Sequence, residues 1–404
     1  MRGARNLRIR RIALPLAAAA ALILAAPAAA KQLPPPTVPA PINAPDPATT
    51  PQGSPFEGDG MWIWYASKSS GGSPSAIASR AQASGIETVF LKSSDGPNYW
   101  SQFNLAYVSS LKARGLRVCA WQYVYGRQPT TEARMGRKAI QNGADCLVID
   151  AEIEYEGKYA QADTYIHKLR AYAGDEYPIG LAGWPYVDYH PAYPFSVFLG
   201  PGGAQFDVPQ MYWKAIGVSV DRIFEHTYLW NSLYGRTIAP LGQTYDRPKS
   251  PELDRFRELA AAYGAPGVSW WSWQSTSSGA WSALGRELMP ITGAQSALPQ
   301  APSLKRNAKG DVVVWAQQHL LAAEPDQPVS VSGRFDAATK RAVRAFQEAS
   351  ALPVTGVLDT PTWQLLLQRE PVPVRWRSGS RAGRPVPASA KLRPLMKEIP
   401  AKPH

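Results

Sequence analysis

The chain has 404 residues, two cysteines and a formal net charge of +12 at pH 7. This length allows more than one domain with a sizeable core, and two cysteines exclude both a disulfide scaffold and a cysteine-rich metal site. The first 30 residues carry five Arg and no acid, and the residues from Pro371 onward carry eight Lys or Arg and one acid. Residues 31–370 are therefore neutral overall, which argues against a nucleic-acid surface.

Residues 1–30 have the pattern of a secretory signal peptide. The five Arg are followed by an apolar run over 12–26 and by three Ala at 28–30, which offer a cleavage site. The run is short for a membrane span, and no later stretch reaches about 18 uninterrupted apolar residues. We therefore expect a secreted protein, extracellular or periplasmic, with no stable membrane span after cleavage. An uncleaved N-terminal anchor is the alternative.

Residues 31–55 are rich in Pro, Ala and Thr and predict an extended linker. Residues 56–293 then alternate between strand-like and helix-like segments. Eight alternations over about 240 residues predict an α/β fold, a (β/α)8 barrel of the TIM type. The irregular, aromatic stretch 187–201 is expected as a loop over the barrel mouth. The predicted strands are Met61–Tyr65, Thr88–Lys92, Arg117–Tyr123, Cys146–Glu152, Ile179–Trp184, Phe206–Trp213, Thr237–Gln243 and Val268–Trp273.

The two cysteines, Cys119 and Cys146, lie near the beginnings of the third and fourth predicted strands. Export would permit a disulfide between them. Direct neighbours on parallel strands bridge only with strained geometry, however, which favours two buried thiols. A disulfide is the alternative.

The fourth predicted strand ends in two carboxylates. Side chains alternate along a strand, so Asp150 and Glu152 share one face. Two neighbouring acids at the end of a buried strand repel each other and resist burial, and a fold keeps them more readily for chemistry than for stability. The alternative is a structural pair bound to Lys92 or to the backbone. Glu154 and Glu156 are expected beyond the strand, in solvent.

The predicted strands also end in aromatic residues, at the face where TIM barrels carry their active sites. Flat rings with polar edges suit sugar faces, and a ring of them around one mouth favours a carbohydrate site. Large core residues are the alternative for about half of them. The expected sugar-binding residues include Trp121, Tyr123, Trp184, Trp213, Trp271 and Trp273.

Several other chemistries are excluded. The five His show no metal-binding spacing, and neither Cys lies beside a likely His partner. No Gly-x-Ser-x-Gly motif or phosphate loop is present. No metal or cofactor is therefore expected. Two carboxylates among aromatic residues leave glycoside cleavage as the leading option.

Residues 294–303 predict a second linker, residues 304–368 a small three-helix domain and residues 369–404 a basic, disordered tail. The small domain carries turn and helix signals at Gly310, Val313, Gln317, Ser332–Phe335, Thr339, Ala342, Val343, Phe346, Gln347, Leu352, Gly356–Leu358, Thr360, Thr362 and Trp363. In this order they closely resemble the peptidoglycan-binding domain of bacterial cell-wall hydrolases. Trp315 and Ala316 are less usual in the first helix of that family.

The resemblance implies noncovalent attachment to peptidoglycan and a location at the cell wall. A helical module that has lost ligand binding is the alternative. The basic tail 369–404 could then contact anionic wall polymers. A tail that is only solvated is the other possibility.

In the barrel, the acids of the fourth strand and the segments 90–96, 210–213 and 271–274 resemble parts of two glycoside hydrolase families. These are the chitinase-like enzymes of family 18, whose fourth strand ends Asp-x-Glu, and the muramidases of family 25. Val148 stands where family 18 has another Asp. The first strand, Met61–Tyr65, has no acid where family 25 has an Asp.

The resemblance to family 18 implies a substrate-assisted mechanism. In this hypothesis Glu152 is the general acid, with a pKa raised by its neighbour and by partial burial. Asp150 orients the N-acetyl group, whose oxygen attacks the anomeric carbon, and Tyr212 could hold that oxygen. The further expected sugar-binding residues are Lys92, Asp95 and Gln210.

These resemblances together imply a cell-wall glycosidase, muramidase- or glucosaminidase-like, which hydrolyses β-1,4 bonds of peptidoglycan or a related N-acetylated glycan. The alternative is a non-catalytic wall protein whose barrel binds glycan. A fold does not determine a function, and the missing acid on the first strand favours this alternative.

Overall fold

The computed structural model describes residues 35–39, 42, 53–288, 295–297, 300–324, 326 and 329–376. The predicted signal peptide, most of the predicted linker 31–55 and the tail beyond residue 376 lie outside the described residues. Within the described ranges, every helix is too short or too polar to cross a membrane.

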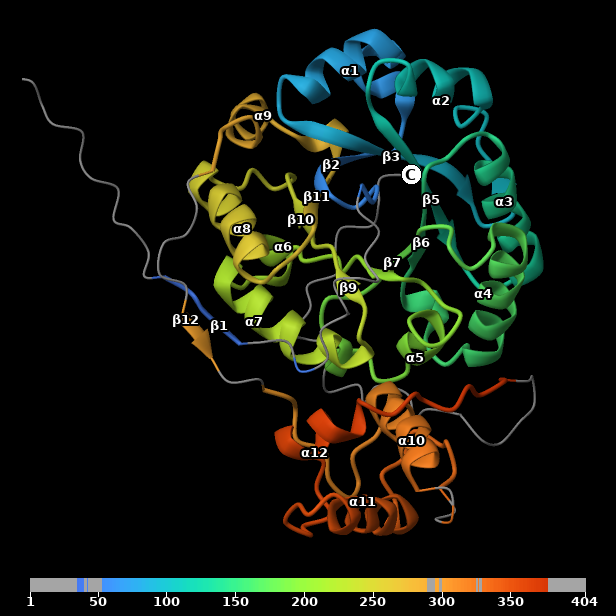
Figure 1. The fold of residues 1–404 in the computed structure, drawn as a ribbon. Coiled ribbons are helices and arrows are strands. Elements are labelled where there is room, and N and C mark those ends of the chain that lie inside the picture. Colours follow the sequence, from blue (N-terminus) through green and yellow to red (C-terminus); the bar gives the residue numbers. More distant parts are fainter. Residues whose placement is uncertain are drawn as a thin grey trace, which may run out of the picture. The chain divides into compact units, whose positions relative to one another are not determined.

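The central sheet is parallel and closes on itself (Figure 1). Its strands pair in the order β10-β11-β2-β3-β5-β6-β7-β8-β9, and β9 and β10 are two halves of one strand, interrupted only at Ala239 and Pro240. On one side of this joint Ala239 N donates to Asp207 O of β8, and on the other Ser269 N of β11 donates to Pro240 O. The predicted α/β barrel is therefore confirmed.

The barrel strands are close to those predicted, although β8 is much shorter. Their bounds are β2 (Gly58–Ile63), β3 (Ile86–Asp95), β5 (Arg117–Val124), β6 (Leu147–Ala151), β7 (Ile179–Ala182), β8 (Phe206–Asp207), β9 (Thr237–Ile238), β10 (Leu241–Gln243) and β11 (Gly267–Trp271). The short β4 (Asn98–Tyr99) pairs antiparallel with the end of β3. A separate two-stranded sheet joins β1 (Thr37–Pro39) to β12 (Gln295–Ala297).

Helices surround the barrel strands in Figure 1. Several begin at a polar cap that accepts a hydrogen bond from the first turn: Ser73 caps α1, Asn104 caps α2 and Ser219 caps α7. The helices are α1 (Pro74–Gln82), α2 (Leu105–Lys112), α3 (Pro129–Gln141), α4 (Tyr159–Ala173), α5 (Phe195–Phe198), α6 (Trp213–Ile216), α7 (Val220–Asn231), α8 (Ser250–Ala262) and α9 (Ser278–Leu284).

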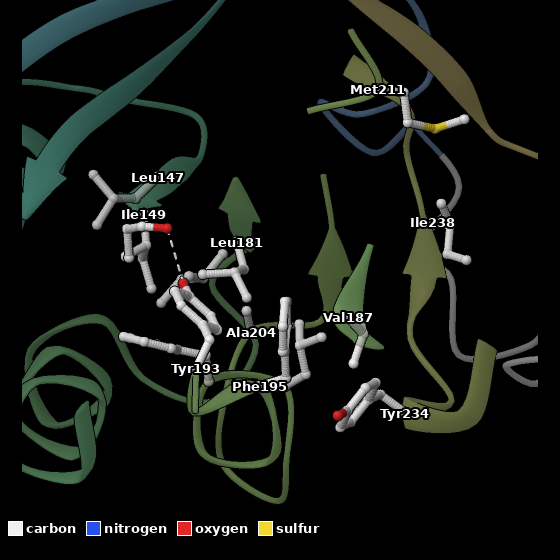
Figure 2. Packing of buried hydrophobic residues seen from close by; sticks show 14 of the residues in the cluster. Leu147, Ile149, Leu181, Val187, Tyr193, Phe195, Ala204, Met211, Tyr234 and Ile238 are labelled. Carbon is white, nitrogen blue, oxygen red and sulfur yellow. Dashed lines mark hydrogen bonds between the residues drawn. The ribbon is translucent and has the colours of Figure 1, made fainter. Parts of the chain in front are cut away.

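Apolar side chains fill two layers, one inside the barrel and one between strands and helices. The strand β6 serves both, because Val148 belongs to the inner cluster and Ile149 to the outer one. At the amino ends of the strands Phe56 stacks on Phe206, with ring centroids 4.2 Å apart, and closes the interior. Figure 2 shows the outer layer around Ile149 and Tyr193. The carboxyl end of β6, which carries the two acids, therefore lies at the opposite, open end of the barrel.

Cys119 and Cys146 form a disulfide, so the favoured interpretation as two thiols is wrong. Ala120 pairs with Leu147, which places the two preceding cysteines directly opposite each other. Both point into the barrel, and their Cα atoms are 4.6 Å apart. That separation lies within the range for disulfides. The backbone around Cys146 already pairs with β5, since Ala120 N donates to Cys146 O at 2.9 Å. The argument from strained geometry failed because two direct strand neighbours that point to the same side lie within disulfide reach.

The C-terminal helical domain consists of α10 (Asp311–Ala323), α11 (Ala337–Ala349) and α12 (Thr360–Leu366). Two buried glutamines hold its turns. Gln317 accepts hydrogen bonds from the backbone of Ser332 and Gly333, and Gln347 accepts one from Gly356 N and donates to Val357 O. At both places in the predicted motif, a Gln side chain on a helix is therefore hydrogen-bonded to the backbone of a turn that contains Gly.

Residues 371–376, at the beginning of the segment expected as a tail, pack against the folded chain. Val372 N donates to Gln318 O, and the ring of Trp376 lies 4.5 Å from that of Tyr159. The basic residues beyond 376 are not among those described.

One buried acid of the outer layer makes the stability pH-dependent. Asp207 is fully enclosed and accepts a hydrogen bond from Asn231 Nδ2 (2.7 Å), while its Oδ1 has no partner in the described part of the chain. Burial raises the pKa of Asp207 to about 7. The folded pKa exceeds the unfolded one, so this stabilising contribution is present at low pH and lost as the pH rises through 7.

We expect Asp207→Asn to remove this dependence, because the amide keeps the Asn231 contact without a charge. Between pH 5 and pH 8.5 the wild type should lose about 3 kcal/mol of unfolding free energy relative to the variant. Urea unfolding at the two pH values measures this difference. Parallel pH dependences of the two proteins would contradict the assignment.

Candidate active site at the barrel mouth

A single side-chain amide bridges the two carboxylates at the end of β6. Asp150 is buried and Glu152 is half-buried. Gln210, in the segment after β8, donates from Nε2 to Asp150 Oδ1 (3.2 Å) and to Glu152 Oε1 (3.1 Å). One donor nitrogen can reach both groups only if both project from the same face of β6, as the alternation predicts. The structure therefore brings Asp150, Glu152 and Gln210 together.

Two tyrosines lie beside these carboxylates. Tyr123 of β5 is the direct strand neighbour of Asp150. Burial, followed by the charges of Glu152, Asp150 and Glu154, raises the pKa of Tyr123 well above its usual value. Burial also raises the pKa of Tyr212, with smaller contributions from Tyr245 and from the two strand carboxylates. Both hydroxyls therefore stay protonated and can donate hydrogen bonds.

Glu154 and Glu156 are not simply solvated, in contrast to the prediction. Glu154 is half-buried and accepts a hydrogen bond from Tyr123 Oη at 2.8 Å. Glu156 lies 2.8 Å from Nδ1 of His190. The prediction was wrong because the chain turns into a short 3-10 helix after Glu152 and folds these acids back toward the barrel. The mouth thus carries a third carboxylate, Glu154.

Lys92 of β3 is enclosed by three indole rings. Its side chain is only 1% exposed, and Nζ lies 2.6 Å from Asp95 Oδ2. The same nitrogen lies 4.2, 4.5 and 4.9 Å from the ring centroids of Trp64, Trp100 and Trp121, within the range of cation–π attraction. Lys92 therefore orients Asp95 and the rings.

Asp95 is the more accessible member of this pair, with a side chain 30% exposed. Its second oxygen, Oδ1, accepts a hydrogen bond from Tyr125 Oη at 2.7 Å. Two partners thus fix the carboxylate while part of it still faces solvent, where a sugar hydroxyl could reach it.

The predicted aromatic residues divide into two groups. Trp121 is fully buried in the barrel interior, and half-buried Trp271 lies against it at 5.4 Å. Trp184, also half-buried, stacks on His190 at 4.2 Å. Trp213 and Trp273 instead turn into the outer layer, where they pack against Phe256 of α8 and Trp281 of α9.

This outward placement of Trp213 and Trp273 differs from the predicted position at the mouth. Both residues begin a helical turn beyond the end of the strand, at α6 and at a 3-10 helix. The change of backbone direction ends the alternation of side chains between the two faces of the strand. The prediction from that alternation therefore does not extend to Trp213 and Trp273.

Three mouth residues were not singled out by the sequence analysis as sugar contacts. They are Trp64, Trp100 and Tyr245. The Nε1 of Trp64 and the hydroxyl of Tyr245 are buried and lack a hydrogen-bond partner within the described ranges. Trp64 follows β2, where family 25 carries an acid, and Tyr245 lies 5.5 Å from the ring of Tyr212. An aromatic residue at a strand end was the available signal for Trp64, which directly follows β2. Tyr245 lies two residues beyond β10, and Trp100 follows the short β4, a strand that the sequence did not predict.

Other buried acids lie away from this site. Asp207 faces Asn231 of α7, and Asp59, at the amino end of β2, faces Arg257 at 3.3 Å. Among the described residues, no group of three or more His, Cys, Asp or Glu could hold a metal ion.

Comparisons with known proteins give one family match and a set of structural neighbours. Residues 309–366 match the family model of a peptidoglycan binding domain, which confirms the family predicted for this region. No curated protein sequence matches the chain.

Several of the similar solved structures are named as chitinases or chitinase-like proteins. A chitinase from Chromobacterium violaceum has 12% identity and a TM-score of 0.44, over 56% of this chain and 98% of that chain. A class V chitinase from Pseudomonas fluorescens Pf-5 has 9% identity and a TM-score of 0.43, over 56% and 98%. A chitinase-like agglutinin from Robinia pseudoacacia has 12% identity and a TM-score of 0.39, over 56% and 98%. Similarities this low do not indicate what the barrel binds or cleaves.

The enclosure of Lys92 leads to a stability prediction. Lys92→Met keeps the stem but removes the charge that contacts three indoles and Asp95, and should lower the unfolding free energy by about 2 kcal/mol. Lys68→Met is the matched control. Lys68 also makes a cation–π contact, but it is exposed and lies over one ring only, that of Tyr65, at 4.6 Å. The control should lose less than about 0.5 kcal/mol. Equal losses in urea unfolding would contradict the proposed bracing by Lys92.

Proposed function

We propose that the barrel is a glycoside hydrolase that cleaves β-1,4 bonds of peptidoglycan or a related N-acetylated glycan. The observation that carries this proposal is the pair Asp150 and Glu152, bridged by Gln210 inside an aromatic mouth. Paired carboxylates are the usual groups of glycoside cleavage, and aromatic rings suit sugar faces.

The different burial of the two carboxylates supports different roles. Glu152 is the more exposed, so it can reach the glycosidic oxygen and act as general acid. Asp150 is buried and orients the N-acetyl group of the substrate. The acetamido oxygen then attacks the anomeric carbon while Glu152 protonates the leaving oxygen, which is the substrate-assisted exception to the two-carboxylate scheme.

Tyr212 supports this scheme because its hydroxyl stays protonated next to both carboxylates. A protonated hydroxyl can donate to the acetamido oxygen and hold it against the anomeric carbon. A group held in attack geometry before reaction contributes through orientation. We assign the sugar contacts to Asp95 and to aromatic residues of the mouth. Tyr123 and Trp271 are half-buried, and Trp184, Trp64 and Tyr245 each carry a polar atom with no hydrogen-bond partner within the described ranges.

The peptidoglycan-binding domain supports a location at the cell wall, and the pattern of residues 1–30 supports export. A wall-bound enzyme meets its substrate at a raised local concentration, because the second binding event is intramolecular. The basic residues beyond 376 are proposed as an additional contact to anionic wall polymers.

One observation favours a second candidate, a barrel that binds glycan without cleaving it. The end of β2 contributes Trp64 and no carboxylate to the mouth. Such a barrel would still present its rings and hydroxyls to sugar. Loss of turnover with retained binding is the outcome that favours this candidate.

Release of reducing ends from purified peptidoglycan distinguishes the hydrolase from the glycan-binding barrel. Glu152→Gln should lower the rate by about 10²–10⁴-fold, the usual contribution of general acid catalysis. It should leave wall binding unchanged, because the amide oxygen can still accept from Gln210.

Glu154→Gln is the matched control, since it removes a carboxylate from the same mouth. Its rate should stay within about tenfold of the wild type. If the wild type binds peptidoglycan but releases no reducing ends, the hydrolase proposal is wrong and the binding candidate stands.

A further inference from the structure

The first turn of the peptidoglycan-binding domain is bonded into the barrel through one buried carboxylate. Asp311 opens α10 and is 1% exposed. Its Oδ1 accepts from Ser196 Oγ and Tyr159 Oη, and its Oδ2 from Ser196 N and Tyr234 Oη, each at 2.7 Å. All four donors belong to the barrel. The backbone N of Asp311 donates to Pro191 O at 2.8 Å.

The neighbouring residues of α10 complete this contact. Trp315, unusual for the family, donates from Nε1 to Leu233 O at 2.7 Å and packs against the ring of Tyr234. Gly310 has φ +116°, and a Cβ there would lie 2.6 Å from Pro191 Cβ. Only glycine allows both this conformation and this approach. The unusual Trp315 and the constrained Gly310 are therefore both explained by the contact of the first helix with the barrel.

The barrel segment that receives α10 also holds the end of β6. Between Pro191 and Ser196 lies Tyr193, whose hydroxyl donates to the carbonyl oxygen of Ala151 at 2.9 Å (Figure 2). Gly157 N donates to the carbonyl oxygen of Ala192 at 2.7 Å. Segment 191–196 thus contacts the helical domain on one side, and on the other the strand end and turn that carry the site.

The contact at Ala151 is the decisive one. Ala151 lies between Asp150 and Glu152 in the chain, and its side chain projects to the opposite face of the strand. The backbone that fixes the direction of the Ala151 carbonyl group therefore also fixes the directions of the two carboxylate side chains. Tyr193 is fully buried in the apolar layer outside β6, where it cannot touch a substrate. Its hydrogen bond to Ala151 acts on the site through the backbone of β6.

We infer that docking of the helical domain on segment 191–196 holds the end of β6, so that this domain positions the catalytic carboxylates as well as binding the wall. The inference deepens the proposed function and rests on it for its catalytic consequence. Asp311 and Tyr193 are positioning residues in this arrangement. A barrel whose helical domain is undocked should therefore be impaired even on a small soluble glycan that needs no wall attachment.

Hydrogen–deuterium exchange on the full chain tests the coupling independently of activity. Asp311→Ala should speed exchange in segment 191–196 and also in residues 150–157 by about tenfold. Asp336→Ala is the matched control, because Asp336 caps α11 within the same domain and its side chain bonds to Thr339 there. That control should speed exchange only within the helical domain. Exchange of 150–157 that stays at the wild-type rate in Asp311→Ala would overturn the inference.

Tyr193→Phe is the milder variant. It should keep the fold, because it removes only one hydroxyl. It should lower kcat on a soluble N-acetylated oligosaccharide by about tenfold with little change in KM, because small misplacements of reacting groups are costly. Its matched control is Tyr165→Phe, since the hydroxyl of Tyr165 is buried without a partner in the described part of the chain.

The outcomes separate the two claims. A wild-type kcat in Tyr193→Phe, with active wild type, would contradict the positioning role and leave the hydrolase proposal intact. An inactive wild type would contradict the hydrolase proposal, while the exchange of residues 150–157 in Asp311→Ala would still decide the coupling.

Discussion

The structure depends on keeping two carboxylates at the end of one buried strand. Burial and mutual repulsion both oppose such a pair, so fixed donors have to surround it. Gln210 supplies one amide to both acids, and protonated Tyr123 and Tyr212 lie beside them. The closed barrel supplies the rigid frame, because each of these residues comes from a different strand position and only closure brings the strand ends to one mouth.

The surrounding parts each hold this arrangement from another direction. The disulfide joins β5 to the beginning of β6 inside the barrel, and Lys92 holds three indoles and Asp95 at the end of β3. From outside, Tyr193 donates a hydrogen bond to the carbonyl oxygen of Ala151, and the segment that carries Tyr193 is bonded to helix α10 through Ser196. A wall-binding module that is also part of the frame differs from a module on a free tether, for which only local concentration would change.

Local patterns predicted the barrel and the shared face of Asp150 and Glu152, because strand alternation and β/α repetition are read directly from the sequence. They failed where the outcome depends on the exact end of a strand. Trp213 and Trp273 turned outward and Glu154 turned inward because helical turns begin there. The state of Cys119 and the burial of Asp311 depend on contacts between distant segments, which no local pattern contains; the unusual Trp315 was the one available sign of the docking.

The most direct test of the account is a crystal structure of Glu152→Gln, the variant expected to turn over slowly, with an N-acetylated oligosaccharide. The account predicts a sugar in the barrel mouth whose acetamido group is hydrogen-bonded to Asp150 and Tyr212. The oxygen of the scissile bond should lie within hydrogen-bond distance, about 2.6–3.2 Å, of the side chain at position 152. A sugar bound with its acetamido group and glycosidic oxygen directed away from these residues would contradict the account.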